Sequence, residues 1–317
     1  MSRKRKPLPL LENVEIEAVA AEGKCVAHVN DMVVFVPFVV PGDIVNLQVT
    51  KKRRSYCEAI VEQFISFSNK RIEPKCTHFG VCGGCKWQNL PYVEQLKAKH
   101  QQVLDQLTRI GKIELPEITH ILGSEKTEEY RNKLEFGCSN KRWYTKEELA
   151  ELPEGVGLSQ GAIGFHIPGA FDKIYPIEKC HLMDDFCNKV RNAIRDYSFE
   201  NDIQFYDIRA QHGLLRDIMF RNSNTGEWMV LVQFKFEEAG DEQKAIDLLQ
   251  FISDKFPEIT SLLYVDNQKG NDTFNDYLSQ YLKGMTIFLN LWKAYGLKLG
   301  RRVFTKRIPI RLTTFIL

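Results

Sequence analysis

Apolar and polar positions alternate over short stretches in the first part of the chain, in a pattern typical of β-strands. Five β-rich runs lie between residues 8 and 65, separated by turn signals at 22–23, 30–31 and 41–43. A chain segment this short with this many strands predicts a small OB-like β-barrel. Barrels of this shape often bind nucleic acid. We therefore assign residues 1–65 to a barrel of a kind that can bind nucleic acid.

The pattern changes after the barrel, first to a loop rich in Cys and Gly and then to a helical period. Between Pro91 and Gly111 apolar residues recur about every 3.6 positions, which predicts a helix. We expect its apolar stripe to pack against a core. Residues 66–118 are therefore predicted to be a cysteine-containing loop followed by a helix.

Residues 119–276 mix both periods, which predicts a central α+β domain and an α+β fold class for the chain. The polar stretch 222–226 predicts an antiparallel hairpin between two of its strands. Residues 139–161 are polar and are expected to be a surface insertion, and GVGLSQG at 155–161 lacks the following helix of a dinucleotide site. The predicted strands are 133–138, 203–210, 215–221, 227–236 and 261–266, and the predicted helices are 184–197 and 241–256, each beginning at an Asp suited to capping.

Composition excludes several classes of protein. The 317 residues contain no run of about 18 apolar positions, so no membrane span is expected. The basic start of the chain is followed by acidic residues, which interrupt any signal-peptide pattern. We therefore expect a cytoplasmic protein, a monomer, whose eight cysteines are thiols or metal ligands rather than disulfides.

Charge is distributed unevenly along the chain. Residues 277–317 hold eight Lys or Arg and no Asp or Glu, while the rest of the chain holds 35 basic and 41 acidic residues. Ordinary domains mix the two signs. We interpret residues 277–317 as an aberrant basic tail, and a shift of reading frame near Tyr277 is one hypothesis for it. The alternative is a basic tail that contacts RNA.

The sharpest chemical motif is a set of three closely spaced cysteines, Cys76, Cys82 and Cys85, with Gly83 and Gly84 between the last two. Glycines permit the tight turns that point several sulfurs toward one centre. Cys180 is the most plausible distant fourth thiol. Zinc sites usually take two pairs of ligands, whereas a three-plus-one split favours a [4Fe–4S] cluster. Zinc and reduced, unligated thiols remain alternatives.

Two groups of basic residues flank the barrel, one at residues 3–6 and one formed by Lys51, Lys52, Arg53 and Arg54. Next to a barrel that binds nucleic acid, such clusters favour contacts with phosphate groups. The alternative is a solvated tail and a charged hairpin turn.

These residues together resemble the RNA uracil-C5 methyltransferases, most closely the bacterial 23S rRNA type with a [4Fe–4S] cluster. The resemblance covers about residues 8–276, and it rests on the barrel, the cysteine loop and four later motifs. These motifs are YRNKLEF at 130–136, IGFH at 163–166, IEKC ending at Cys180, and LLRDIMFR at 214–221. It implies a TRAM barrel that binds RNA, a cluster held by Cys76, Cys82, Cys85 and Cys180, and 23S rRNA as the partner.

The resemblance also implies the reaction. In this family a cysteine thiolate adds to C6 of uracil, C5 then takes a methyl group from S-adenosylmethionine, and a carboxylate removes the C5 proton. A C-terminal Rossmann-like domain carries this chemistry and binds the methyl donor. No nucleophile or glycine-rich motif of that domain follows residue 276. We therefore expect the domain to be absent and the chain to be inactive alone, and we assign no catalytic or donor-binding residue.

Within the central domain, Arg131 and Lys133 are candidate RNA contacts, with ion pairs to neighbouring glutamates as the alternative. A different class of function also fits the sequence. A non-enzymatic module that binds RNA, or that senses redox state through its cluster, would need the same barrel and cysteines. Such a module would bind RNA in a salt-dependent way and have no activity requiring S-adenosylmethionine.

Overall fold

The computed structural model describes residues 8–153, 160–273, 280–284, 287–289 and 298–300. The chain divides into two compact units. The N-terminal unit contains residues 1–80 and 84–127, and the C-terminal unit contains residues 81–83 and 128–317. None of the helices in the described part of the chain is long and apolar enough to cross a membrane.

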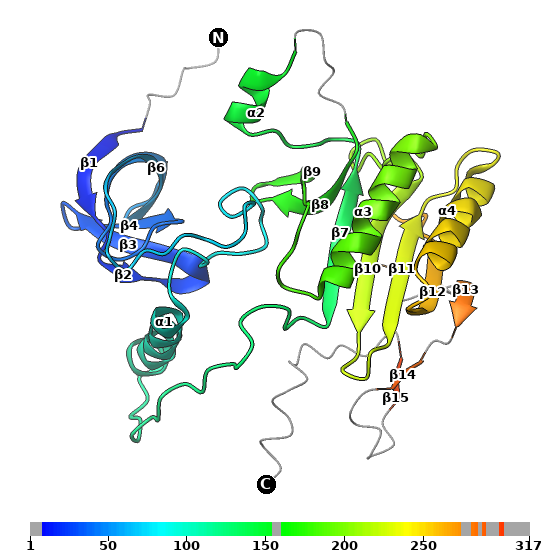
Figure 1. Ribbon diagram of the computed structural model, residues 1–317. Coiled ribbons are helices and arrows are strands. Elements are labelled where there is room, and N and C mark those ends of the chain that lie inside the picture. Colours follow the sequence, from blue (N-terminus) through cyan, green and yellow to red (C-terminus); the bar gives the residue numbers. More distant parts are fainter. Residues whose placement is uncertain (1–7, 154–159, 274–279, 285–286, 290–297, 301–317) are drawn as a thin grey trace. The chain divides into compact units, whose positions relative to one another are not determined.

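The N-terminal unit is built on a six-stranded sheet with the order β1-β5-β6-β4-β3-β2 (Figure 1). Neighbouring strands are antiparallel, apart from β4 and β6, which run parallel. The run predicted as a single first strand is divided into β1 and β2, because Ile16 and Glu17 between them bond to Asp43 and Val26 instead. The strands are β1 (Leu10–Glu15), β2 (Ala18–Val19), β3 (Lys24–Val29), β4 (Met32–Pro37), β5 (Ile44–Lys52) and β6 (Tyr56–Ser66).

Small and β-branched side chains fill the interior of this sheet. Alternating positions of β3, β4 and β5 point inward, which is the pattern expected for strands with one buried face. Cys25 and Cys57 belong to this core, and burial raises the pKa of the Cys25 thiol to about 12. These two thiols therefore serve as apolar filling of the barrel.

Helix α1 (Tyr92–Asp105) follows the cysteine loop and continues into a π-helical turn at Gln106–Ile110. The sequence predicted this helix correctly, but the prediction that its apolar stripe packs on a core is wrong. None of its residues is buried, and Val93 and Val103 are 61% and 47% exposed. The helical period predicts which face of the helix is apolar. It does not predict whether another element covers that face.

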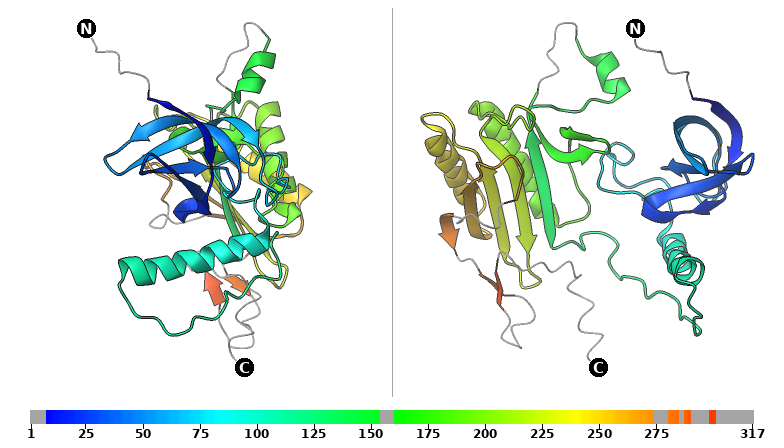
Figure 2. Two further views of the ribbon diagram at one scale, coloured as in Figure 1. Left: turned by 90° about the vertical axis from the view of Figure 1, so that its left-hand side faces the viewer. Right: turned by 180° about the vertical axis from the view of Figure 1, so that it is seen from behind.

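The C-terminal unit is a mixed seven-stranded sheet with the order β13-β12-β11-β10-β7-β8-β9. Most of its neighbouring strands are antiparallel, but β11 and β12 run parallel and are connected through helix α4 (Figures 1 and 2). The strands are β7 (Lys133–Ser139), β8 (Ala162–Ile167), β9 (Ala170–Pro176), β10 (Leu215–Asn222), β11 (Trp228–Phe234), β12 (Ile259–Asp266) and β13 (Gln280–Gly284). A separate pair, β14 (Ile287–Leu289) and β15 (Lys298–Gly300), is antiparallel.

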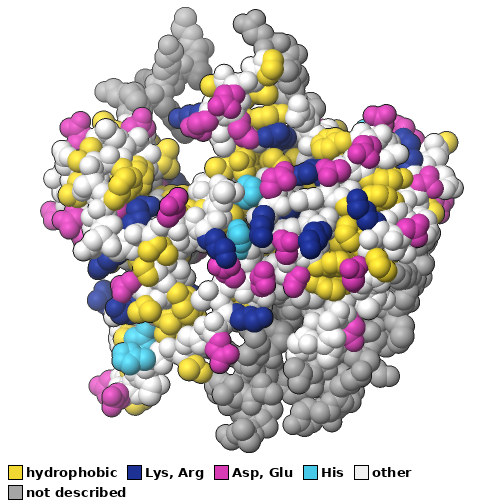
Figure 3. Space-filling view, viewed as in Figure 1, with side chains coloured by type: hydrophobic (Ala, Val, Ile, Leu, Met, Phe, Trp, Pro, Cys, Tyr) yellow, Lys and Arg dark blue, Asp and Glu magenta, His cyan; other side chains and the backbone are white. Residues whose placement is uncertain are grey.

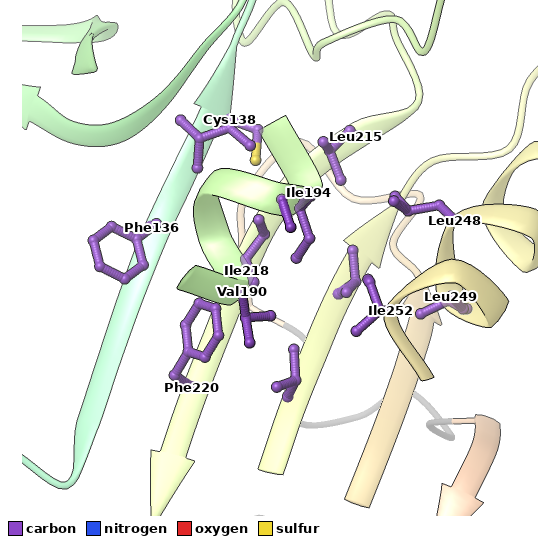
Figure 4. Close-up of a cluster of buried hydrophobic side chains, with 14 of the residues drawn as sticks. Phe136, Cys138, Val190, Ile194, Leu215, Ile218, Phe220, Leu248, Leu249 and Ile252 are labelled. Atoms are coloured by element: carbon purple, nitrogen blue, oxygen red, sulfur yellow. The ribbon is translucent and has the colours of Figure 1, made fainter. Parts of the chain in front are cut away.

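Helices α3 (Asp185–Glu200) and α4 (Asp241–Lys255) lie side by side across one face of this sheet (Figure 1). Phe136 and Phe220 from the strands meet Val190 and Ile194 of α3 in the core between them (Figure 4). Asp184 caps α3 by accepting a bond from the Phe186 N–H, as the sequence predicted. The cap of α4 is instead Gly240, which has a φ of +97°.

The predicted strands at β7, β10, β11 and β12 are present, and the predicted hairpin joins β10 to β11. Residues 203–210 are not a strand, because Asp207 accepts backbone bonds from Arg209 and Ala210 and closes a turn there. The predicted insertion contains helix α2 (Lys146–Glu151), whose Thr145 and Glu148 form a capping box. Residues 154–159, which include most of GVGLSQG, and the basic group at 3–6 lie outside the described residues.

Candidate functional site

The cysteine loop places two of the predicted ligands, Cys76 and Cys85, in the N-terminal unit. The backbone N–H of Cys76 donates to Gln88 Oε1 at 3.1 Å, and its carbonyl accepts from the Phe79 N–H at 3.0 Å. Burial raises the pKa of the Cys76 thiol, the nearby Cys85 raises it further, and backbone N–H groups of His78 and Phe79 oppose this. N–H groups directed at a sulfur are suited to stabilise a thiolate ligand.

The other two predicted ligands, Cys82 and Cys180, belong to the C-terminal unit, where both contact its main core. The side chain of Asn188, on α3, hydrogen-bonds to both the N–H and the carbonyl group of Cys180. Its Oδ1 accepts from the Cys180 N–H at 2.8 Å, and its Nδ2 donates to the Cys180 carbonyl at 3.1 Å. The position of Cys180 is therefore fixed by a buried asparagine.

A buried guanidinium lies beside this turn. Arg191 is 1% exposed and donates to Asn188 Oδ1 at 2.9 Å and to the Glu178 carbonyl at 2.7 Å. Burial lowers its pKa, and the thiols of Cys187 and Cys180 are close enough to counteract this. A buried cation is costly unless negative charge lies nearby, and thiolates would supply that charge.

The four predicted ligands are divided between the two units, two in each. Within the described ranges, no three side chains of His, Cys, Asp or Glu lie together in a way that would hold a metal ion. All eight cysteines are free thiols. Thiols are suitable ligands for iron or zinc, and the assignment of the four ligands stays a prediction.

The predicted basic hairpin joins β5 to β6, and its four basic side chains are exposed. Lys51 pairs with Glu58 at 2.9 Å, and Lys24 lies 3.9 Å from the same carboxylate. The Lys51 hydrogen bond is the main cause of the lowered pKa of Glu58, and Lys24 and Arg53 contribute. One acid thus faces several cations, so this turn presents positive charge to solvent.

In the central region, Lys133 Nζ lies 2.6 Å from Glu135 Oε1, the ion pair that sequence reasoning named as the alternative to RNA contact. Arg131 is exposed, and its backbone N–H donates to the Leu182 carbonyl at 2.9 Å. Neither observation tests RNA binding, so both residues remain candidates.

A buried polar network at one end of the C-terminal sheet was missed by sequence reasoning. The side chain of Arg216 donates to the carbonyl groups of Asn267, Lys269 and Asn271, and its guanidinium lies 4.2 Å from the ring centroid of Tyr206. Next to it, Gln233 donates to Asp217 Oδ1 at 3.4 Å and accepts from Asn267 at 2.9 Å. The only signal in the sequence was a charged pair within an apolar strand pattern.

Asp217 makes this network sensitive to pH. Burial raises the pKa of its carboxyl well above the usual range, and Glu135 and Asp272 raise it further, while Gln233 and Lys133 oppose them. The folded protein therefore binds this proton more tightly than the unfolded chain does. As pH rises above the unfolded value of about 3.9, this group lowers stability progressively.

Asp217→Asn is therefore expected to stabilise the C-terminal unit at about pH 8, because the amide stays neutral and keeps its place beside Gln233. The urea midpoints of unfolding of the wild type and the variant, at pH 4, 6 and 8, provide the measurement. The advantage of the variant should grow with pH. A constant difference between the two proteins across this range would contradict the expected charge effect.

Comparisons with known proteins place these features in context. Residues 12–61 match the TRAM domain family. A Bacteroides thetaiotaomicron protein named as an uncharacterized RNA methyltransferase is 53% identical over 287 residues, which is 90% of this chain. A Porphyromonas gingivalis protein of the same name is 44% identical over 294 residues, or 92% of this chain. The chain spans 63% of the length of each of these relatives.

Among solved structures, the chain resembles that of the Pyrococcus abyssi tRNA (uracil-54, C5)-methyltransferase in complex with S-adenosyl-L-homocysteine. The TM-score is 0.62 at 18% identity, and the match covers 96% of this chain and 63% of the other. At this level of identity the likeness concerns the fold.

This likeness corrects the predicted fold class. The prediction that the Rossmann-like methyltransferase domain is absent is wrong, because the match to the structure of a methyltransferase extends over 96% of this chain. The prediction relied on the absence of glycine-rich and nucleophile motifs after residue 276, and short motifs do not report the path of the backbone. The sheet also contains a parallel β11–α4–β12 unit, which the sequence pattern did not reveal.

Proposed function

We propose that this chain acts in the methylation of RNA at C5 of uracil, with S-adenosylmethionine as the methyl donor and 23S rRNA as the substrate, in the cytoplasm. The observation that carries the proposal is the similarity of about nine tenths of the chain to proteins named RNA methyltransferases. The match to the TRAM domain family supports RNA as the partner. The choice of 23S rRNA rests on the motifs of the cysteine loop and the central domain.

S-adenosylmethionine would supply an electrophilic methyl group when bound. We assign no residue to the donor site and none to the chemistry. The buried thiols of Cys25, Cys138 and Cys187 are unsuited to nucleophilic attack, since burial raises the pKa of each. Their place in the two cores is consistent with packing.

A [4Fe–4S] cluster bound by Cys76, Cys82, Cys85 and Cys180 is part of this proposal. Three local features support it: the proximity of Cys76 to Cys85, the fixed backbone of Cys180, and the buried Arg191 beside that thiol. A cluster with four thiolate ligands carries negative charge, which Arg191 would balance. We expect the cluster to have a structural role.

The RNA contacts that we propose are the basic hairpin of Lys51, Lys52, Arg53 and Arg54, together with Arg131 and Lys133. The hairpin has the stronger support, since it lies within the segment that matches the TRAM domain family and presents several cations around one acid. Contacts of this kind bind the phosphate backbone and fix the orientation of the RNA without reading its sequence.

Cross-linking in living cells tests the proposed partner. Ultraviolet light would be used to link the tagged protein to bound RNA, and the linked RNA would be sequenced. We expect the reads to concentrate in one region of 23S rRNA, with fewer reads for a variant in which the four basic hairpin residues are alanine. Concentration in tRNA would overturn the choice of substrate, and an even distribution over all RNA would overturn the proposal itself.

A further inference from the structure

An aromatic side chain lies unusually exposed at the end of β6. Phe67 is 66% exposed, and its ring centroid is 4.9 Å from that of Phe64, with a tilt of 33° between the rings. The guanidinium of Arg71 lies 4.9 Å from the Phe64 centroid and 5.4 Å from the Phe67 centroid. An exposed ring beside an arginine offers a face on which a flat ligand can stack.

Arg71 is held in this position by a buried carboxylate. Asp43 has no exposed side-chain surface, and its Oδ2 accepts from Arg71 Nη2 at 2.5 Å and its Oδ1 from Arg71 Nε at 3.3 Å. The same carboxylate accepts backbone N–H bonds from Val40 and Ser68. The guanidinium is therefore fixed before any ligand binds, which lowers the entropy cost of binding.

Phe38 extends this group of side chains. Its φ of +61° is strained for a bulky residue, and the conformation lets its carbonyl accept from Arg71 Nη2 at 3.3 Å and from Asn89 Nδ2 at 3.1 Å. The Lys86 ammonium lies 5.9 Å from the Phe38 ring centroid. We call Phe38, Phe64, Phe67, Arg71 and Lys86 the cation–aromatic band.

The segment that supplies the two cations of the band is basic. Residues 68–100 contain six Lys or Arg and two Glu. One of the two acids, Glu94, pairs with Lys97 at 2.6 Å, and the Lys99 ammonium lies 5.8 Å from the Trp87 ring centroid. Hydrophobic and basic side chains lie next to one another on the visible face of this unit (Figure 3). Positive charge among aromatic rings fits a partner that has both phosphates and flat bases.

We propose that the cation–aromatic band binds single-stranded RNA, with an unpaired base stacked on Phe67 and adjacent phosphates near Lys86. This inference rests on the proposed function and adds a base-contacting surface separate from the phosphate-contacting hairpin at residues 51–54. Bases of unpaired RNA stack on aromatic rings and on arginine planes without need of a specific sequence. The band therefore holds an unpaired stretch of the RNA while the target uracil is selected elsewhere.

Binding of the full chain to a fluorescent 20-nucleotide single-stranded RNA tests this proposal. Phe67→Ala and Phe67→Leu are each expected to weaken binding by about 5- to 100-fold, the range measured for loss of one stacked base. Phe67→Trp is expected to keep wild-type affinity. Phe199→Ala, which removes a ring that is 50% exposed on α3, is the matched control and should change nothing.

Salt dependence separates stacking from charge. Phe67→Ala should lower affinity equally at every salt concentration, whereas Lys86→Ala should reduce the slope of log affinity against log salt by about 0.7. Annealing the RNA to its complement should abolish the effect of Phe67. If the wild-type chain binds no RNA, the proposed function fails. If it binds RNA and the Phe67 variants bind equally well, or if Phe67→Leu is as good as Phe67→Trp, only the stacking proposal is overturned.

Discussion

Replacing Asp43 with alanine is expected to destabilise the N-terminal unit by about 3–5 kcal/mol, because the change leaves a largely buried guanidinium and two backbone N–H groups without their acceptor. Asp43 has no exposed side-chain surface, and Arg71, its partner, is 19% exposed. Few single substitutions outside a hydrophobic core cost this much. Asp43 connects the turn before β5 to the segment after β6, so its loss disrupts both of these segments at once.

Urea unfolding followed by circular dichroism measures this effect. Asp43→Asn keeps the shape of the side chain and removes its charge, so the same loss in both variants would assign the effect to the ion pair. Glu58→Ala breaks an exposed ion pair with Lys51 and is the control, with an unfolding midpoint close to that of the wild type. A midpoint for Asp43→Ala within error of the wild type would contradict the structural role of this carboxylate.

Loss of one ligand is expected to remove the metal almost entirely. Protein purified without air should contain about four iron atoms per chain and be brown, as a [4Fe–4S] cluster requires. Cys180→Ala should lose most of this iron, because a cluster with an open ligand position is labile. Cys187→Ala is the matched control, since Cys187 is a buried thiol of the same core, and it should retain its iron.

Iron, zinc and sulfide analysis of the purified proteins gives the readout. Cys76→Ser offers a second test in the half-exposed loop, in case the buried substitution prevents folding. Unchanged iron in both variants would refute the ligand assignment. A colourless wild-type protein with one zinc would establish the zinc alternative instead.

Sequence patterns predicted the elements whose residues are uniformly apolar or strongly periodic. Strands β10 and β11 and helices α3 and α4 belong to this group, since burial on the sheet dictates their composition. The β8–β9 hairpin was not predicted, because Pro168 and Gly169 separate two short apolar runs. Residues 203–210 were wrongly predicted to be a strand, because residues typical of strands surround a turn that Asp207 stabilises. Local composition is a weak guide where a side chain bonds to its own backbone.

The candidate sites divide in a similar way. The cysteine loop stood out in sequence because its spacing is local, and the basic hairpin because its charges are adjacent. The contacts of Asp43 with Arg71 and of Arg216 with Asn267 join residues far apart in the chain. No local sequence pattern therefore predicts them. Phe67 fell in the predicted loop segment 66–118 and carried no signal until its exposure and its neighbour Arg71 were known.

The central proposal is that this chain acts in the methylation of uracil in 23S rRNA, and the 5-methyluridine content of that RNA tests it most directly. Mass spectrometry of nucleosides would compare 23S rRNA and tRNA from cells with and without the gene. The account predicts that 5-methyluridine disappears from one position of 23S rRNA and persists in tRNA when the gene is deleted. Unchanged 5-methyluridine in 23S rRNA of the deletion strain would contradict it.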